Sequence, residues 1–116
     1  MLLLNKEKGT ILAEQLRVAD TFFRRLRGLL GTKTLPAGQG LVIRPCNSVH
    51  TLGMHYAIDV LFVDNKDCIL KIVADLRPGK WAACRGSAYV IELPAGTAAH
   101  TFTQAGDALV YAKEPG

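Results

Sequence analysis

The chain has 116 residues, of which 49% are hydrophobic and 21% are charged, and its formal net charge is +4. This length suits one globular domain with its own core, and this composition excludes a disordered or low-complexity chain. The mild basic excess does not by itself favour a nucleic-acid partner, because polyanion binders concentrate their basic residues in one stripe.

The first residues and the cysteines favour a cytoplasmic protein. Only three consecutive leucines follow Met1, whereas a secretory signal needs an apolar core of roughly 7–15 residues and a membrane span roughly 18. The three cysteines are odd in number and widely spaced, a pattern typical of free thiols in a reducing compartment. We therefore expect one cytoplasmic domain over residues 1–116, either a monomer or a homodimer formed through an edge strand.

The first third of the chain predicts a hairpin followed by a helix. Apolar residues at 2–4, a polar turn at 6–9 and apolar residues again over 10–18 indicate two strands. Near residues 20–31 the apolar side chains fall within an arc of about 120° on a helical projection, and Gly31 is a natural stop. The opposite side carries arginines, either as a solvated face or as an anion-binding patch: Arg24, Arg25 and Arg27.

Short apolar runs separated by turn residues make up the rest of the chain. The strongest strand is predicted over 57–63, and the polar turn at 64–67 joins it to a partner strand over 68–74. Residues 75–86 indicate irregular structure. Further strands are predicted over 41–43, 48–52, 89–93 and 108–112, with one short helical turn within 97–105.

This order of elements predicts a mainly β fold. Several short strands without strand–helix alternation favour a compact curled sheet, a sandwich or a barrel-like form, with one amphipathic helix near residues 20–31. We expect the segment AIDVLFVD, residues 57–64, to run through the middle of this fold.

Five motifs give the chain a resemblance to a known family. They are RGLL (27–30), GLVI (40–43), HTLGMHYAIDVLFVD (50–64), IELPAG (91–96) and GD (106–107). In their order and spacing they resemble the domain of unknown function 192 family, in the branch that has a His-Thr pair at the start of the central motif. The resemblance implies a compact, mostly β domain and no established activity.

The candidate ligand site lies in this central motif. His50, Thr51 and Met54 supply an imidazole, a hydroxyl and a soft apolar side chain, a mixture that suits a small cleft and equally suits an ordinary edge of a β domain. Asp59 directly precedes the apolar run VLFV, where an unpaired carboxylate is costly. We expect it to have a partner, either a cation such as Arg27, which would then belong to the site, or backbone N–H groups of a turn.

A second acidic residue, Glu92, lies within the apolar run VIEL. Strand alternation places its side chain on the face opposite those of Ile91 and Leu93. We therefore expect Glu92 to be exposed.

Cys46 suggests two alternatives to a ligand cleft, namely a thiolate–imidazole pair and a zinc site. With His50, and oriented by Asp59, it has the residue types of a thiolate–imidazole pair, although no local signature that would activate the thiol follows it. Cys46, His50 and His55 are also possible zinc ligands, but they lack the tight pairs typical of zinc sites. No metal or cofactor is therefore expected.

The leading hypothesis is a binding or accessory module with a small cleft around His50–Asp59, whose partner is a small ligand or a protein. The first alternative is an enzyme that uses Cys46 and His50 for acyl or thiol chemistry. The second is a binder of nucleic acid or of an anionic surface through basic residues on and around the predicted helix, namely Arg17, Arg24, Arg25, Arg27 and Lys33.

Overall fold

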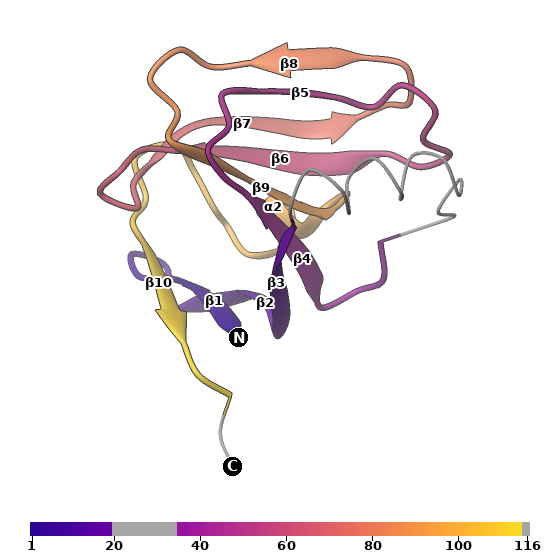
Figure 1. The fold of residues 1–116 in the computed structure, drawn as a ribbon. Helices are drawn as coiled ribbons and strands as arrows, with labels where there is room; N and C mark the ends of the chain where they lie inside the picture. The colour runs from indigo at the N-terminus through magenta and orange to yellow at the C-terminus, as the bar shows by residue number, and fades with distance from the viewer. Residues whose placement is uncertain (20–34, 115–116) are drawn as a thin grey trace.

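The computed structural model describes residues 1–19 and 35–114, and strands dominate them (Figure 1). They form one five-stranded, one three-stranded and one two-stranded sheet, and these sheets are not closed into a barrel. The prediction of a mainly β fold is confirmed. The amphipathic helix predicted near residues 20–31, together with Arg27, lies outside the described residues.

The five-stranded sheet is the centre of the fold. Its first two strands are parallel and every other neighbouring pair is antiparallel. The segment predicted to be central becomes an interior strand, buried at every position because both faces of the sheet are covered. In spatial order the strands are β3 (Gln15–Ala19), β4 (Gln39–Ile43), β9 (Tyr89–Pro94), β6 (Ile58–Val63) and β7 (Ile69–Leu76).

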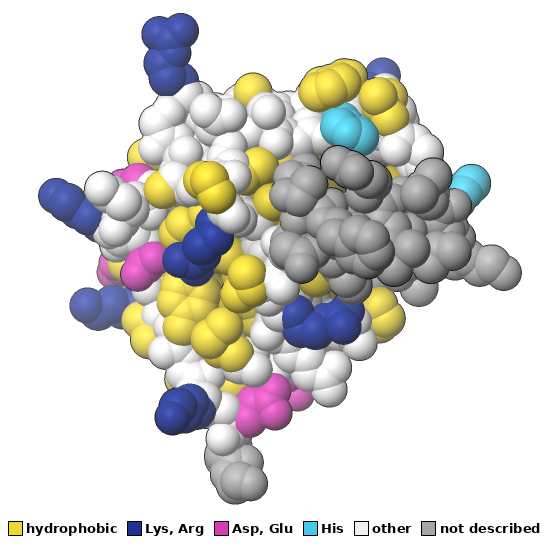
Figure 2. Space-filling view, viewed as in Figure 1, with side chains coloured by type: hydrophobic (Ala, Val, Ile, Leu, Met, Phe, Trp, Pro, Cys, Tyr) yellow, Lys and Arg dark blue, Asp and Glu magenta, His cyan; other side chains and the backbone are white. Residues whose placement is uncertain are grey.

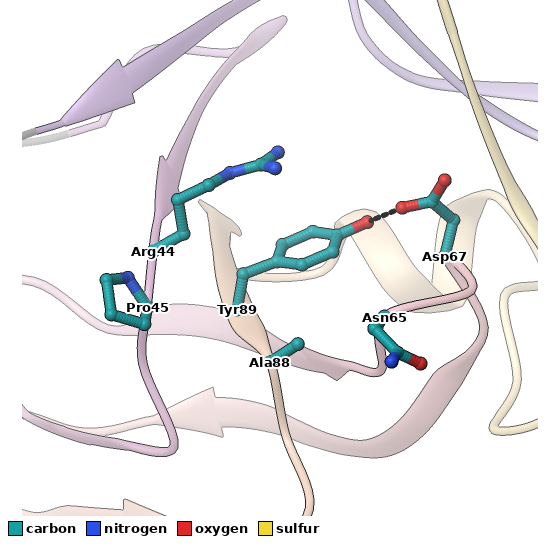
Figure 3. A pocket seen from close by; sticks show the side chains of 6 residues that line it. All are labelled: Arg44, Pro45, Asn65, Asp67, Ala88 and Tyr89. Carbon is teal, nitrogen blue, oxygen red and sulfur yellow. Dashed lines mark hydrogen bonds between the residues drawn. The ribbon is translucent and has the colours of Figure 1, made fainter.

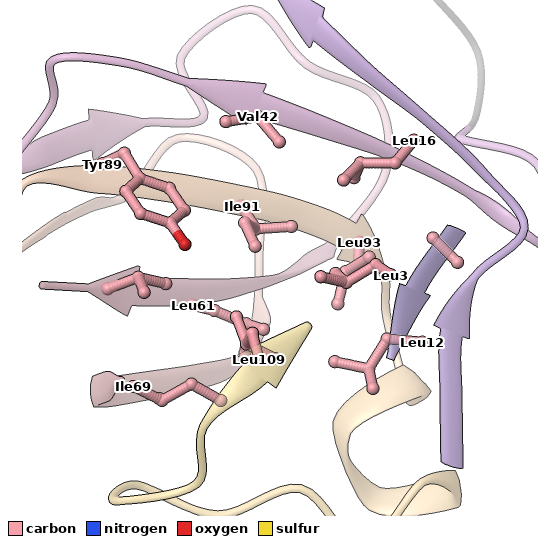
Figure 4. Close-up of a cluster of buried hydrophobic side chains, with 12 residues drawn as sticks. Leu3, Leu12, Leu16, Val42, Leu61, Ile69, Tyr89, Ile91, Leu93 and Leu109 are labelled. Carbon is pink, nitrogen blue, oxygen red and sulfur yellow. The ribbon is translucent and has the colours of Figure 1, made fainter. Parts of the chain in front are cut away.

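One face of this sheet packs against the three-stranded sheet, which lies below it in Figure 1. Leu3 and Leu109 of the small sheet meet Leu61 and Ile91 of the large one in a shared apolar cluster (Figure 4). Burial of such side chains is the main stabilising contribution to a fold of this size. The strands of the small sheet, in spatial order, are β10 (Leu109–Ala112), β1 (Leu2–Asn5) and β2 (Thr10–Ala13).

The single strand predicted over residues 10–18 is in fact two. The chain breaks at Glu14, whose N–H and that of Gln15 both donate to the carbonyl of Gly38, at 2.8 and 2.9 Å. The break moves the chain from the three-stranded to the five-stranded sheet. Leu12 and Leu16, on either side of it, still pack in the same cluster.

The opposite face of the large sheet is covered by β5 (Ser48–His50) and β8 (Trp81–Ala83), which pair antiparallel and lie above β6 and β7 in Figure 1. Val49 of β5 enters a second apolar cluster with Phe62 and Val90. The prediction of irregular structure over 75–86 is wrong at β8, a strand too short to show alternation in the sequence. The predicted helical turn is present as α2 (Thr97–His100).

Glu92 shows the effect of covering both faces. Its side chain points away from Ile91 and Leu93, as alternation requires, but only 1% of its surface is exposed. The expectation that Glu92 is exposed is wrong, because the sequence does not show that this second face is also buried.

Candidate functional site

Asp59 is completely buried and binds two backbone N–H groups. Its Oδ1 accepts from the N–H of Asp75 at the end of β7, and its Oδ2 accepts from the N–H of Ala98 in α2, both at 2.9 Å. The expected partner is therefore backbone, while Arg27 lies outside the described residues. Because each oxygen accepts a backbone N–H from another element, Asp59 joins β6, β7 and α2 from a position without solvent exposure.

Thr51 is also completely buried and closes a loop. Its hydroxyl donates to the carbonyl of Arg77 at 2.6 Å and accepts from the N–H of Lys80 at 2.9 Å. Its own N–H donates to the carbonyl of Lys80 at 2.9 Å, and its carbonyl accepts from Gly79 at 3.0 Å. Thr51 thus fixes the loop between β7 and β8 onto the end of β5, and its hydroxyl is fully used there.

His50 lies beside Trp81 on the outer side of the β5–β8 sheet. The two residues are directly opposite each other in the register. The next pair, Thr51 and Lys80, is joined by a hydrogen bond, and so is Asn47 with Cys84, three positions along in the other direction. Because hydrogen-bonded and non-hydrogen-bonded pairs alternate in an antiparallel ladder, His50 and Trp81 form a non-hydrogen-bonded pair, whose side chains lie closer together.

The rings of His50 and Trp81 are 4.9 Å apart between centroids and are tilted by 47°. His50 Nδ1 accepts from the N–H of Leu52 at 3.3 Å, which fixes the imidazole ring. The Trp81 side chain remains 66% exposed. No local pattern in the sequence indicates Trp81 as a site residue, because only the strand register brings it to His50.

Met54 and Cys46 are half-buried and pack against the apolar cluster beneath β5. The Cys46 thiol donates to the carbonyl of Ser48 at 3.0 Å. Within residues 1–19 and 35–114, no hydrogen bond joins Cys46 to His50, and no group of three or more His, Cys, Asp or Glu side chains could hold a metal ion.

The basic residues predicted as an anion-binding face lie, apart from Arg17, outside the described residues. On the face seen in Figure 2, the Lys and Arg side chains of the described residues are scattered around the surface rather than gathered in one stripe. No helix in the described part of the chain is long and apolar enough to cross a membrane.

Solved structures share this fold. A protein of unknown function from Novosphingobium aromaticivorans superposes with a TM-score of 0.78 at 19% identity, over 95% of this chain and 83% of that one. A putative transcription regulator from Sinorhizobium meliloti gives a TM-score of 0.76 at 21% identity, over 94% and 89% of the two chains. At these identities the likeness concerns the fold alone.

Sequence relatives carry names without an assigned activity. A UPF0127 protein of Thermococcus sibiricus is 33% identical in an alignment 114 residues long, which covers 91% of this chain and 71% of that protein. A UPF0127 protein of Pyrococcus furiosus is 30% identical in an alignment 113 residues long, which covers 92% of this chain and 95% of that protein. The model of the DUF192 family, described as Uncharacterized ACR, matches residues 3–111. The chain therefore belongs to the domain of unknown function 192 family, as its five motifs indicated.

Proposed function

We propose that this protein is a binding module that takes a small ring-shaped ligand on the exposed His50–Trp81 pair. The observation that carries the proposal is that Trp81 is 66% exposed while its indole contacts the imidazole of His50. An indole left in solvent beside a second ring offers a large apolar contact area and stacks favourably on another ring.

The support beneath the pair is rigid. Thr51 fixes the end of β5 to the loop that leads into β8, and Asp59 fixes the strand of the large sheet below. A pair of rings held in this way loses little conformational freedom on binding. In this proposal Thr51 and Asp59, two of the residues predicted to contact a ligand, support the ring pair from beneath.

The size of the exposed apolar surface favours a small ligand over a protein partner. Among the residues that the structure describes, Leu52 is the other exposed large apolar side chain next to the pair in the chain. A stable protein interface buries about 800 Å² on each partner, far more than these side chains provide. The other exposed large apolar residues of the described chain lie on other elements, among them Ile11, Val18 and Phe102.

The test uses the fact that Trp81 is the only tryptophan of the chain, so its fluorescence reports on this surface directly. The probes are adenosine monophosphate, maltose and benzyl alcohol, three small molecules that carry different rings and of which none is a zwitterionic amino acid. We expect at least one to change the Trp81 emission in a saturable way. The proposal is wrong if none of the three does so.

A pair of histidine variants localises the binding. We expect His50→Ala to weaken the binding of that probe about fivefold, because an aromatic contact contributes roughly 0.5–1.5 kcal/mol. His100→Ala is the matched control, since His100 is an exposed histidine on α2, and it should leave the affinity unchanged. Equal affinity in the His50→Ala variant would also contradict the proposal.

A further inference from the structure

A hollow of about 330 Å³ lies on a different part of the molecule (Figure 3). Its volume falls within the range of small-ligand sites, roughly 300–1,000 Å³. The ring of Tyr89 forms part of its wall and points to the face of the large sheet opposite β5 and β8. The hollow is lined by the ends of three segments, through Arg44, Pro45, Asn65, Asp67, Ala88 and Tyr89.

A chain of hydrogen bonds holds the aromatic wall in place. The hydroxyl of Tyr89 donates to Oδ1 of Asp67 at 2.7 Å and lies 2.5 Å from the hydroxyl of Tyr111. Since Tyr89 has one hydroxyl proton and gives it to Asp67, Tyr111 is the donor in the second bond. Burial raises the pKa of Tyr89 far above its ordinary value of 10, so the phenol stays protonated and keeps this arrangement.

Asp67 is held rigidly in an unusual backbone conformation. Its φ of 62° lies in the left-handed region, where aspartate and asparagine are enriched among the residues other than glycine. The turn is fixed by the Asp67 N–H, which donates to the carbonyl of Asp64 at 3.2 Å, and by the N–H of Leu109, which donates to the carbonyl of Asp67 at 2.8 Å.

The second carboxylate oxygen of Asp67 has no hydrogen-bond partner in the part of the chain that the structure describes. Arg44 lies across the hollow, with its guanidinium carbon 4.7 Å from the centre of the Tyr89 ring. Figure 3 shows the two charged side chains coming from different walls, with Arg44 along one side of the Tyr89 ring and Asp67 at its hydroxyl end. They form no ion pair with each other, and no described residue forms one with either.

We propose that this hollow binds a small zwitterion, of which a free amino acid is the simplest, between Arg44 and Asp67. The guanidinium of Arg44 presents paired N–H donors suited to a carboxylate, and the open oxygen of Asp67 accepts from an ammonium group. Pro45 and Ala88 provide an apolar surface for the side chain of the ligand. Because one charge of each sign lines the hollow, a ligand that carries both is bound better than a ligand that carries one.

The first test compares L-leucine with two molecules that each lack one of its charges, 4-methylpentanoate and 3-methylbutylamine. Binding is followed through the NMR signals of the Tyr89 and Tyr111 rings. We expect L-leucine to shift these signals in a saturable way and each single-charge molecule to bind at least about tenfold more weakly. The proposal fails if L-leucine causes no saturable shift, or if either single-charge molecule binds as tightly.

The second test assigns the two charges. Asp67→Asn removes the carboxylate charge but keeps an oxygen for Tyr89, and asparagine tolerates left-handed backbone. Arg44 is exposed, so Arg44→Ala should leave the fold intact, which circular dichroism checks. We expect each variant to weaken L-leucine binding about tenfold or more.

The control is Arg77→Ala, which removes an exposed arginine that does not line the hollow and should leave the affinity unchanged. Wild-type affinity in either test variant, or an equal loss in the control, would overturn the proposal. L-leucine should not change the Trp81 emission. The result of the L-leucine tests is therefore independent of the proposed ring-binding site on β5 and β8.

Discussion

Replacing Asp59 by asparagine tests the support beneath the candidate site. Each carboxylate oxygen of Asp59 accepts one backbone N–H, from Asp75 and from Ala98, both at 2.9 Å. An asparagine has one acceptor oxygen and one donor nitrogen. Whichever way the amide is turned, one of the two N–H groups therefore faces another donor.

The expected loss of stability follows from this geometry. A hydrogen bond to a charged group contributes about 1.5–3 kcal/mol, and a buried N–H left without an acceptor costs about 1–3 kcal/mol, two estimates that partly overlap. We expect Asp59→Asn to lower the free energy of unfolding by about 3 kcal/mol, and Asp59→Ala by about the same or slightly more. Domains of this size have about 5–15 kcal/mol of stability, so the variants should remain folded and measurable.

Urea unfolding followed by circular dichroism measures the effect, and Asp75→Asn is the matched control. The Asp75 side chain is exposed and pairs only with the exposed Arg77 among the described residues. Its replacement should therefore change the stability by less than about 0.5 kcal/mol. The reasoning is refuted if the free energy of unfolding of Asp59→Asn is within about 1 kcal/mol of the wild-type value. It is also refuted if Asp59→Asn and Asp75→Asn lose equal stability.

Two further predictions concern other buried polar groups. Thr51→Val removes the hydroxyl bonded to Arg77 and Lys80 and should lower the free energy of unfolding by about 2 kcal/mol. Thr51→Ser keeps the hydroxyl and should have nearly wild-type stability. Equal losses of stability in the two variants would contradict this prediction. Burial alone would raise the pKa of Asp107, but hydrogen bonds from Asn5, the Gln104 N–H and Lys8 outweigh it and hold the pKa below 3.8. Because the folded-state pKa is the lower one, this stabilisation is present above about pH 4 and is lost as the pH falls through the folded-state pKa. The urea midpoint should therefore fall less between about pH 6 and about pH 3 in Asp107→Asn than in the wild type, and an equal fall would contradict this.

The central strand could be predicted from sequence because its signals are local. A run of six residues that reads IDVLFV is followed at once by a polar turn and a second apolar run, and β6 and β7 form there. The same local signals located β9 and the turn of α2. These elements needed no knowledge of what they would pack against.

The errors arise where distant segments decide the outcome. β8 has three residues and exists because it pairs with β5, more than thirty positions earlier in the chain. Glu92 obeys strand alternation, but its burial depends on what covers the second face of the sheet. Neither feature leaves a periodic pattern in its own segment, so propensity and alternation could not show it.

In the candidate site, too, local sequence predicts some features and distant segments decide the others. That Asp59 needs a partner follows from its position beside an apolar run. The identity of the partner cannot be predicted from that position, because Asp75 and Ala98 lie 16 and 39 positions away along the chain. The contact between His50 and Trp81 likewise depends on strand register, which no local pattern encodes.

The polar residues of the central motif therefore belong to two groups that experiments can separate. Thr51 and Asp59 have their polar atoms satisfied inside the protein, so their replacement should lower stability. His50 and Trp81 present rings to solvent, so their replacement should lower ligand affinity and lower stability only by the value of their mutual contact, about 1 kcal/mol. If His50→Ala destabilised the fold as much as Thr51→Val, the ring pair would be one more internal contact, and the case for a binding surface there would lose its basis.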